Sequence, residues 1–231
     1  MRMADKVLVV AAHPDDEVLG CGGTILRHVD NGDTVHIMIM AEGLTSRDMR
    51  RDADLRQNEL SNLHNCSDKV AEFLGAEKLK MLGFPDNRMD SVDLLDVVKE
   101  IELEVNEFAP DIVYTHNGND VNIDHQVTHD AVLTACRPLP SQSVRQIFFF
   151  ETMSSTEWQV ATADKIFLPN MYVDISAYLD KKIEALHYYD SEMREYPHSR
   201  SYEALRILAM QRGFIVGTQA AEAFMVGRII R

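Results

Sequence analysis

The sequence has few cysteines and no long apolar run. Its three cysteines, Cys21, Cys66 and Cys136, are an odd number, lie far apart and form no CxxC pair. This pattern favours neither a disulfide framework nor a structural zinc site. No apolar stretch approaches the ~18–20 residues that cross a bilayer, and the run Val7–Ala12 is too short for a signal peptide. We therefore expect a cytoplasmic protein with no membrane span.

Positive charge is scarce as well. The chain has 23 lysines and arginines against 37 aspartates and glutamates, a formal net charge of −14. Because proteins that bind nucleic acid usually carry a basic stripe, we expect no nucleic-acid partner. A small anionic substrate is still compatible, since it needs only one or two local arginines. The length of 231 residues and the 45% apolar content predict a single domain over residues 1–231 with a substantial core.

Short apolar strands alternate with amphipathic helices along most of the chain. Strands are predicted at Lys6–Ala12, Thr34–Ala41, Lys78–Leu82, Asp111–His116, Gln146–Phe150 and Met171–Ile175. Helices are predicted over 15–28, 46–74 (as one or two helices), 94–109, 124–136, 176–195 and 201–211, with Gly213 ending the last of them. This alternation predicts an α/β fold: a Rossmann-like, three-layer αβα arrangement with a mostly parallel central sheet and ligands at the carboxyl ends of its strands.

Three glycines lie early in the first predicted helix. Gly20, Gly22 and Gly23 lower its helix propensity, so we expect them to allow close approach of this helix to the sheet or to a substrate. They do not indicate a dinucleotide site. They come about seven residues after the strand instead of in the turn, and an acidic run lies where a pyrophosphate would bind.

The acidic run His-Pro-Asp-Asp-Glu, residues 13–17, follows the first strand directly. His13 and Asp16 are three residues apart across a strand-to-helix turn, so their side chains can face one point. An imidazole and a carboxylate suit a borderline ion such as Zn²⁺. A third ligand has to come from elsewhere, and the richest source is the segment Asn122–His125, with His129 one turn further on.

Asp15 is adjacent to the candidate ligand Asp16, but we expect its side chain to point in a different direction. A carboxylate close to a metal-bound water can act as general base, and the metal lowers the pKa of that water from ~15.7 to about 7. The residues therefore predict metal-assisted hydrolysis.

Two motifs together carry a family resemblance. The run at 13–17, followed far downstream by Asp124-His125, resembles the PIG-L/LmbE family of zinc-dependent N-acetylglucosaminyl deacetylases. The resemblance extends to residues 83–88, 196–198 and 222–224 and covers nearly the whole chain.

The resemblance implies a site and a reaction. His13, Asp16 and His125 would be the zinc ligands and Asp15 the general base, with zinc-bound water as nucleophile. The substrates would be N-acetylated amino sugars, often joined to a lipid, inositol, nucleotide or antibiotic core. Fe²⁺ suits the same ligands. Relatives often assemble as trimers or hexamers, so a homo-oligomer is compatible with the resemblance.

One position departs from the family pattern. Many members have a histidine where this chain has Asn122. An asparagine amide can donate a hydrogen bond to an oxyanion, but it cannot donate a proton at neutral pH. Either Asp15 or another histidine would then protonate the leaving amine, and His198 is the best such histidine.

The candidate substrate contacts come from other parts of the chain. Asp86, Arg88 and Glu151 lie in predicted loops after strands, and Arg50 lies on the face of a predicted helix. The alternative for each is a role only in its own loop or helix face. Trp158 could offer a stacking face. Two other functions stay open: an amidase acting on a thiol-sugar conjugate, and a non-catalytic sugar-binding protein with a relict site.

Overall fold

The computed structural model describes residues 4–231, which contain one seven-stranded sheet and six α-helices. The strand order is β3-β2-β1-β4-β5-β7-β6. The strands are β1 (Lys6–Ala11), β2 (Thr34–Ala41), β3 (Lys78–Phe84), β4 (Ile112–His116), β5 (Gln146–Phe150), β6 (Met171–Asp174) and β7 (Ala221–Ile229). Strands β1 to β5 pair in parallel, and β7 is antiparallel to both of its neighbours. The predicted three-layer α/β fold with a mostly parallel sheet is confirmed.

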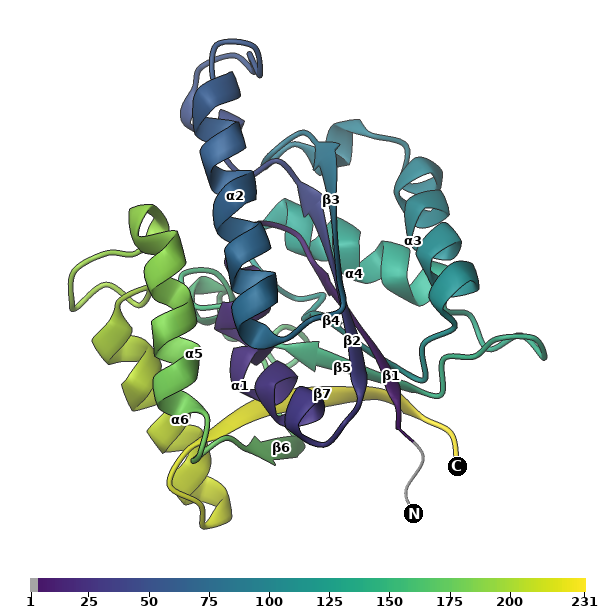
Figure 1. Ribbon diagram of the computed structural model, residues 1–231, viewed down its shortest axis with the longest axis vertical. Coiled ribbons are helices and arrows are strands. Elements are labelled where there is room, and N and C mark those ends of the chain that lie inside the picture. Colours follow the sequence, from purple (N-terminus) through teal and green to yellow (C-terminus); the bar gives the residue numbers. More distant parts are fainter. Residues whose placement is uncertain (1–3) are drawn as a thin grey trace.

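Helices cover both faces of this sheet. The helices are α1 (Asp16–Asp30), α2 (Gln57–Leu74), α3 (Leu94–Phe108), α4 (Ile123–Ala135), α5 (Leu179–Leu186) and α6 (Tyr202–Val216). Figure 1 shows α3 and α4 on one side of the sheet and α1, α2, α5 and α6 on the other. Two large apolar clusters fill the two helix–sheet layers. Among residues 4–231, no helix is long and apolar enough to cross a membrane.

The order of the central strands locates the site. Strand β1 lies between β2 and β4, so the chain winds outward in one direction from β1 to β3 and in the other from β4 to β5. The loops after β1 and β4 separate at this reversal, and ligands of such sheets bind in the crevice that results. The motif at 13–17 follows β1, and His125 begins the helix that follows β4.

The glycines of α1 allow it to approach the sheet closely, as predicted. A Cβ on Gly20 would lie 2.3 Å from Cδ2 of Phe150 on β5, and one on Gly23 would lie 2.8 Å from Cγ2 of Ile175. The helix is kinked at Cys21, whose φ is −148°. The kink leaves backbone N–H groups in mid-helix that need acceptors.

Glu222 on β7 supplies those acceptors. Its carboxylate accepts hydrogen bonds from the backbone N–H of Gly23 (2.9 Å) and of Thr24 (2.7 Å). Its Oε1 is also 2.6 Å from Nζ of Lys182 on α5. Because these groups are buried, the ion pair ties α1, α5 and β7 together beneath the motif.

Three predicted helices differ clearly from the observed ones. Gly213 does not end α6, which continues to Val216 with Gly217 as its C-cap at φ 79°. A Cβ on Gly213 would lie 2.7 Å from the backbone of Ala220, so this glycine serves close packing. The predicted helix over 176–195 is the shorter α5 followed by a 3₁₀ segment, and residues 48–56 precede α2 without regular structure. Strand β7 was not among the predicted strands.

Candidate metal centre

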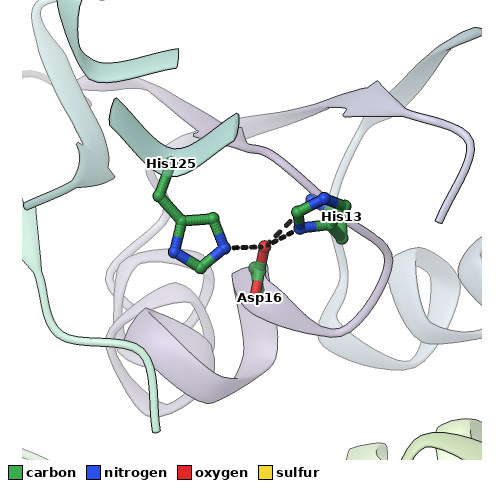
Figure 2. A group of neighbouring side chains, drawn as sticks. All are labelled: His13, Asp16 and His125. Carbon is green, nitrogen blue, oxygen red and sulfur yellow. Dashed lines mark hydrogen bonds and ion pairs between the residues drawn. The ribbon is translucent and has the colours of Figure 1, made fainter. Parts of the chain in front are cut away.

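Three side chains from two loops meet above the sheet. Oδ2 of Asp16 lies 3.2 Å from Nδ1 of His13 and 3.2 Å from Nε2 of His125. The backbone N–H of His13 donates to the same oxygen at 2.9 Å. Figure 2 shows the two imidazoles converging on this carboxylate from opposite sides. One ligand atom from each of the three residues lies within 4.8 Å of the others, close enough together to hold a metal ion.

The outward nitrogen of each imidazole faces a carboxylate. Nε2 of His13 is 3.0 Å from Oδ2 of Asp124 and 3.3 Å from Oδ1 of Asp86. Nδ1 of His125 is 3.2 Å from Oδ2 of Asp120. Carboxylates in this position orient the ring of a ligating histidine and raise its basicity. The arrangement leaves Nδ1 of His13 and Nε2 of His125 facing Oδ2 of Asp16. The space between these three atoms is called the shared point.

Imidazoles and carboxylates at the centre shift one another's pKa values. Burial lowers the pKa of His125, but Asp16 and Asp120 outweigh it and raise that pKa to about 9. Burial raises the pKa of Asp16, but the neighbouring histidines hold it well below its usual range. Burial likewise opposes ionisation of Asp86, yet its contact with His13 brings that pKa to about 2. Positive charge at the shared point therefore stabilises the surrounding carboxylates.

The donor set fits a divalent metal. Oδ1 of Asp16 is buried and has no hydrogen-bond partner among residues 4–231. Two imidazole nitrogens and a carboxylate with an unpaired oxygen match the ligands of open zinc sites. Three protein ligands leave a position for a water or a substrate oxygen.

His116 stacks on His125 but has different hydrogen-bond partners. Their ring centroids are 3.9 Å apart. Nε2 of His116 accepts a hydrogen bond from the backbone N–H of Ala12 at 2.8 Å, so its proton is on Nδ1, near Thr152. Burial and the positive charge of His125 lower the pKa of His116. This neutral, fully buried ring forms the floor of the centre.

Asp15 lies next to the shared point in a strained conformation. Its φ is 106°, which non-glycine residues rarely adopt. The side chain is buried, and Oδ2 is held by Nη1 of Arg200 at 3.0 Å. Among residues 4–231 no group donates to Oδ1. Burial raises the pKa of Asp15, against the opposing pull of Arg200. Glu17 supports the turn by accepting the backbone N–H of Asp15 at 3.1 Å.

The sequence matches the profile of one protein family. The profile of the PIG-L family, described as GlcNAc-PI de-N-acetylase, matches residues 8–136, which is more than half of the chain. The chain belongs to the PIG-L family. The matched span includes the motif at 13–17 and His125.

Members of the PIG-L family resemble the chain over most of its length. A Bacillus cereus protein named "Probable N-acetyl-alpha-D-glucosaminyl L-malate deacetylase 2" is 29% identical over 80% of this chain and 82% of its own. Diacetylchitobiose deacetylase of Thermococcus kodakarensis is 26% identical over 94% and 81%. The structure of N,N'-diacetylchitobiose deacetylase from Pyrococcus horikoshii superposes with a TM-score of 0.76, at 23% identity, over 97% of this chain and 84% of that one.

Asn122, at the position that departs from the PIG-L pattern, caps α4. Its side-chain oxygen accepts the backbone N–H of Asp124 at 2.8 Å, and Nδ2 donates to Oδ1 of Asn87 at 2.9 Å. His198 accepts the backbone N–H of Arg200 on Nδ1 at 3.0 Å, which leaves its neutral proton on Nε2.

The four predicted substrate contacts occupy different places. Asp86 is buried beside His13, and its Oδ2 accepts the backbone N–H of Ser46. Arg88 is half-buried and near the backbone of Asp48. Arg50 is exposed on the segment before α2. Glu151 is turned toward α6, where it accepts two hydrogen bonds from Arg212. The structure brings only Asp86 into contact with the centre.

Two residues at the centre were missed by sequence reasoning. Asp120 lies in the loop before His125, and its place among Asn and Asp residues was the only signal for it. Arg200 lies 185 positions from Asp15 and carries no motif of its own. The contact between Arg200 and Asp15 depends on the tertiary structure, so no local sequence pattern indicates it.

Proposed function

We propose that the protein is a zinc-dependent hydrolase that removes the N-acetyl group from an N-acetylated amino sugar or its conjugate. The observation that carries the proposal is the convergence of His13, Asp16 and His125 beside Asp15, a buried carboxylate with one oxygen free. The named activities of the PIG-L relatives support the choice of an acetamido sugar as substrate.

His13, Asp16 and His125 would hold the metal ion. When bound there, zinc supplies a Lewis acid for the amide carbonyl and lowers the pKa of a water. Asp124 and Asp86 hold the ring of His13, and Asp120 holds that of His125. These contacts keep both ligating nitrogens on the shared point without rearrangement.

Asp15 moves the proton in this proposal. Its free Oδ1 accepts a proton from the attacking water while Arg200 holds Oδ2. We assign to the same oxygen the return of this proton to the nitrogen of the breaking amide bond, because Asn122 cannot donate one; His198 is the alternative donor. The products are acetate and the free amine. Asn122 has one amide hydrogen left to donate to the oxygen that becomes negative.

Two variants separate proton transfer from metal binding. Asp15→Asn should lower acetate release by at least about 10³-fold while zinc content stays near one per chain, since general base and acid are both lost. His13→Ala should lose both zinc and activity. His64→Ala, an exposed histidine on α2, is the matched control and should keep both. The measurements are metal analysis and acetate release from N-acetylglucosamine derivatives. Turnover by Asp15→Asn near the wild-type rate would contradict the role of Asp15.

A further inference from the structure

Trp158 is an exposed aromatic side chain held in a fixed orientation. It ends a 3₁₀ turn, Thr156–Trp158, in the loop after β5, and 55% of the residue is exposed. The imidazole of His198 meets the indole nearly at right angles, with ring centroids 5.6 Å apart and an interplanar angle of 78°. An edge contact of this kind fixes the indole and leaves at least one broad apolar face open to a ligand.

The loop that carries Trp158 is bound to both sides of the metal centre. On the side of the base, Oγ of Ser154 accepts a hydrogen bond from Nε of Arg200 at 2.9 Å, and Arg200 holds Asp15. Trp158 is therefore four residues after Ser154, and Ser154 contacts Arg200, which contacts Asp15, the proposed general base.

The same loop also supports a metal ligand. The hydroxyls of Ser155 and Thr156 donate to the carboxylate of Asp120, which faces His125. Trp158 is two residues after Thr156 in the same 3₁₀ turn, so its position is coupled to that of the centre. Trp158 therefore lies in the loop after β5 whose neighbouring residues contact both Arg200 and Asp120.

Three arginines of the loops around the centre are already paired with carboxylates, which favours an uncharged ligand. Arg47 makes two hydrogen bonds with Glu192, at 2.6 and 2.7 Å, and Arg51 makes two with Glu42, at 2.8 and 3.0 Å. Arg200 is bound to Asp15. An anionic group would have to displace one of these carboxylates, at the cost of leaving a buried or half-buried charge without its partner.

Arg50 and Arg88 are outside these pairs but belong to the other flank, while Arg194 donates to the backbone carbonyl oxygens of Ser191 and Met193. Arg50 precedes α2 and Arg88 follows β3. Strands β3 and β5 lie on opposite sides of β1 in the sheet, so the part of a substrate that reaches Trp158 extends away from both arginines.

We propose that Trp158 is the stacking platform for a second, uncharged ring of the substrate. The preferred substrates are then neutral N-acetylglucosaminides in which the acetylated sugar is joined to another pyranose. The C–H face of a pyranose packs on an open aromatic face, and no cation is needed there. This inference rests on the proposed function, whose site it extends.

The first test is kinetic. Wild type and Trp158→Ala are compared on N-acetylglucosamine, N,N'-diacetylchitobiose and N-acetylglucosaminyl malate. Wild type should have its highest kcat/KM on the disaccharide. In Trp158→Ala the ratio of kcat/KM for disaccharide over monosaccharide should fall about five- to tenfold, and Trp158→Phe should recover most of it. Val160→Ala, an exposed apolar neighbour, should leave the ratio unchanged. An unchanged ratio in Trp158→Ala, or a preference for the malate conjugate, would overturn the inference.

The second test needs no turnover. Trp158 is the only tryptophan of the chain, so a change in tryptophan fluorescence reports on this side chain alone. Zinc-loaded Asp15→Asn titrated with N,N'-diacetylchitobiose should give a saturable change, larger than that with N-acetylglucosamine. A flat titration at concentrations where the disaccharide binds by calorimetry would refute the platform. A saturable change without acetate release by wild type would instead reject the deacetylase proposal and keep the platform.

Discussion

His13 uses both nitrogens of its ring. One faces Asp16, and the other faces the carboxylates of Asp124 and Asp86. His125 is arranged in the same way between Asp16 and Asp120. Each proposed histidine ligand thus has the orientation of its ring set by a carboxylate that faces its second nitrogen. These carboxylates are themselves held by hydrogen bonds. Oδ1 of Asp124, for example, accepts the backbone N–H of Met89 at 2.9 Å.

Asp120 gives a prediction at this scale. Asp120→Asn keeps the shape but removes the negative charge facing Nδ1 of His125, so zinc affinity should fall about 10- to 100-fold. Competition with a chromogenic chelator measures it, and excess zinc should restore most of the activity. Asp130→Asn is the control, since Asp130 is exposed on α4, the helix that carries His125. An unchanged zinc affinity in Asp120→Asn would show that the carboxylate does not act through His125.

The ligand candidates were predictable because they lie in two short motifs. The spacing of His13 and Asp16, and the position of His125 after a strand, are local features of the chain. Arg200 was not predictable, since its contact with Asp15 depends on how a segment 185 positions away folds back. Glu151 follows a strand as an active-site residue would, but Arg212 on α6 binds its carboxylate.

At the scale of elements, α1 is fixed by contacts along its whole length. Its first turn holds Asp16, its middle approaches Phe150 at Gly20, and its kink at Cys21 is capped from β7 by Glu222. A straight helix with larger residues could not occupy this place.

The cap gives a prediction about stability. Glu222→Ala should lower the free energy of unfolding by about 3–5 kcal/mol, because Lys182 is left buried without its partner and two backbone N–H groups lose their acceptor. Urea denaturation measures it. Glu184→Ala, exposed on α5, should change stability by less than about 0.5 kcal/mol. Replacing the pair as Glu222→Leu with Lys182→Met should recover part of the loss. A loss as small as that of Glu184→Ala would mean that the pair does not support the kink.

Strand positions followed from the sequence more closely than helix ends. β2 and β5 have their predicted bounds, because buried parallel strands are short apolar runs with clear limits. Gly213 was expected to stop α6, since glycine disfavours helix. Its contact with the backbone of Ala220, which requires glycine, comes from tertiary packing that propensity does not include.

At the scale of the whole molecule, the centre joins two distant parts of the chain. His13 follows β1, while Asp124 and His125 begin α4, and His13 and Asp124 are 111 positions apart. The sheet brings them together because β1 and β4 are neighbours. A bound metal would cross-link these two segments in the folded state only.

Metal removal should therefore lower the melting temperature. With zinc present at about 1,000 times its dissociation constant, binding adds about 4 kcal/mol, which corresponds to roughly 10 °C for a chain of this size. Differential scanning calorimetry with and without a chelator measures the shift. His13→Ala should melt at the same temperature in both conditions. A chelator effect of equal size in His13→Ala would mean that the ion binds elsewhere.

The hydrogen bonds from Gly23 and Thr24 to Glu222 also bear on biosynthesis. Gly23 and Glu222 are 199 positions apart, so the helix that carries Asp16 is made early by the ribosome while its cap is made late. β7, which pairs with both β5 and β6, is made late as well. Until β7 emerges, Asp16, a proposed ligand, lies on a helix that lacks the acceptor for Gly23 and Thr24. We expect zinc to be acquired after synthesis of β7, which makes metal loading a late step in the maturation of the enzyme.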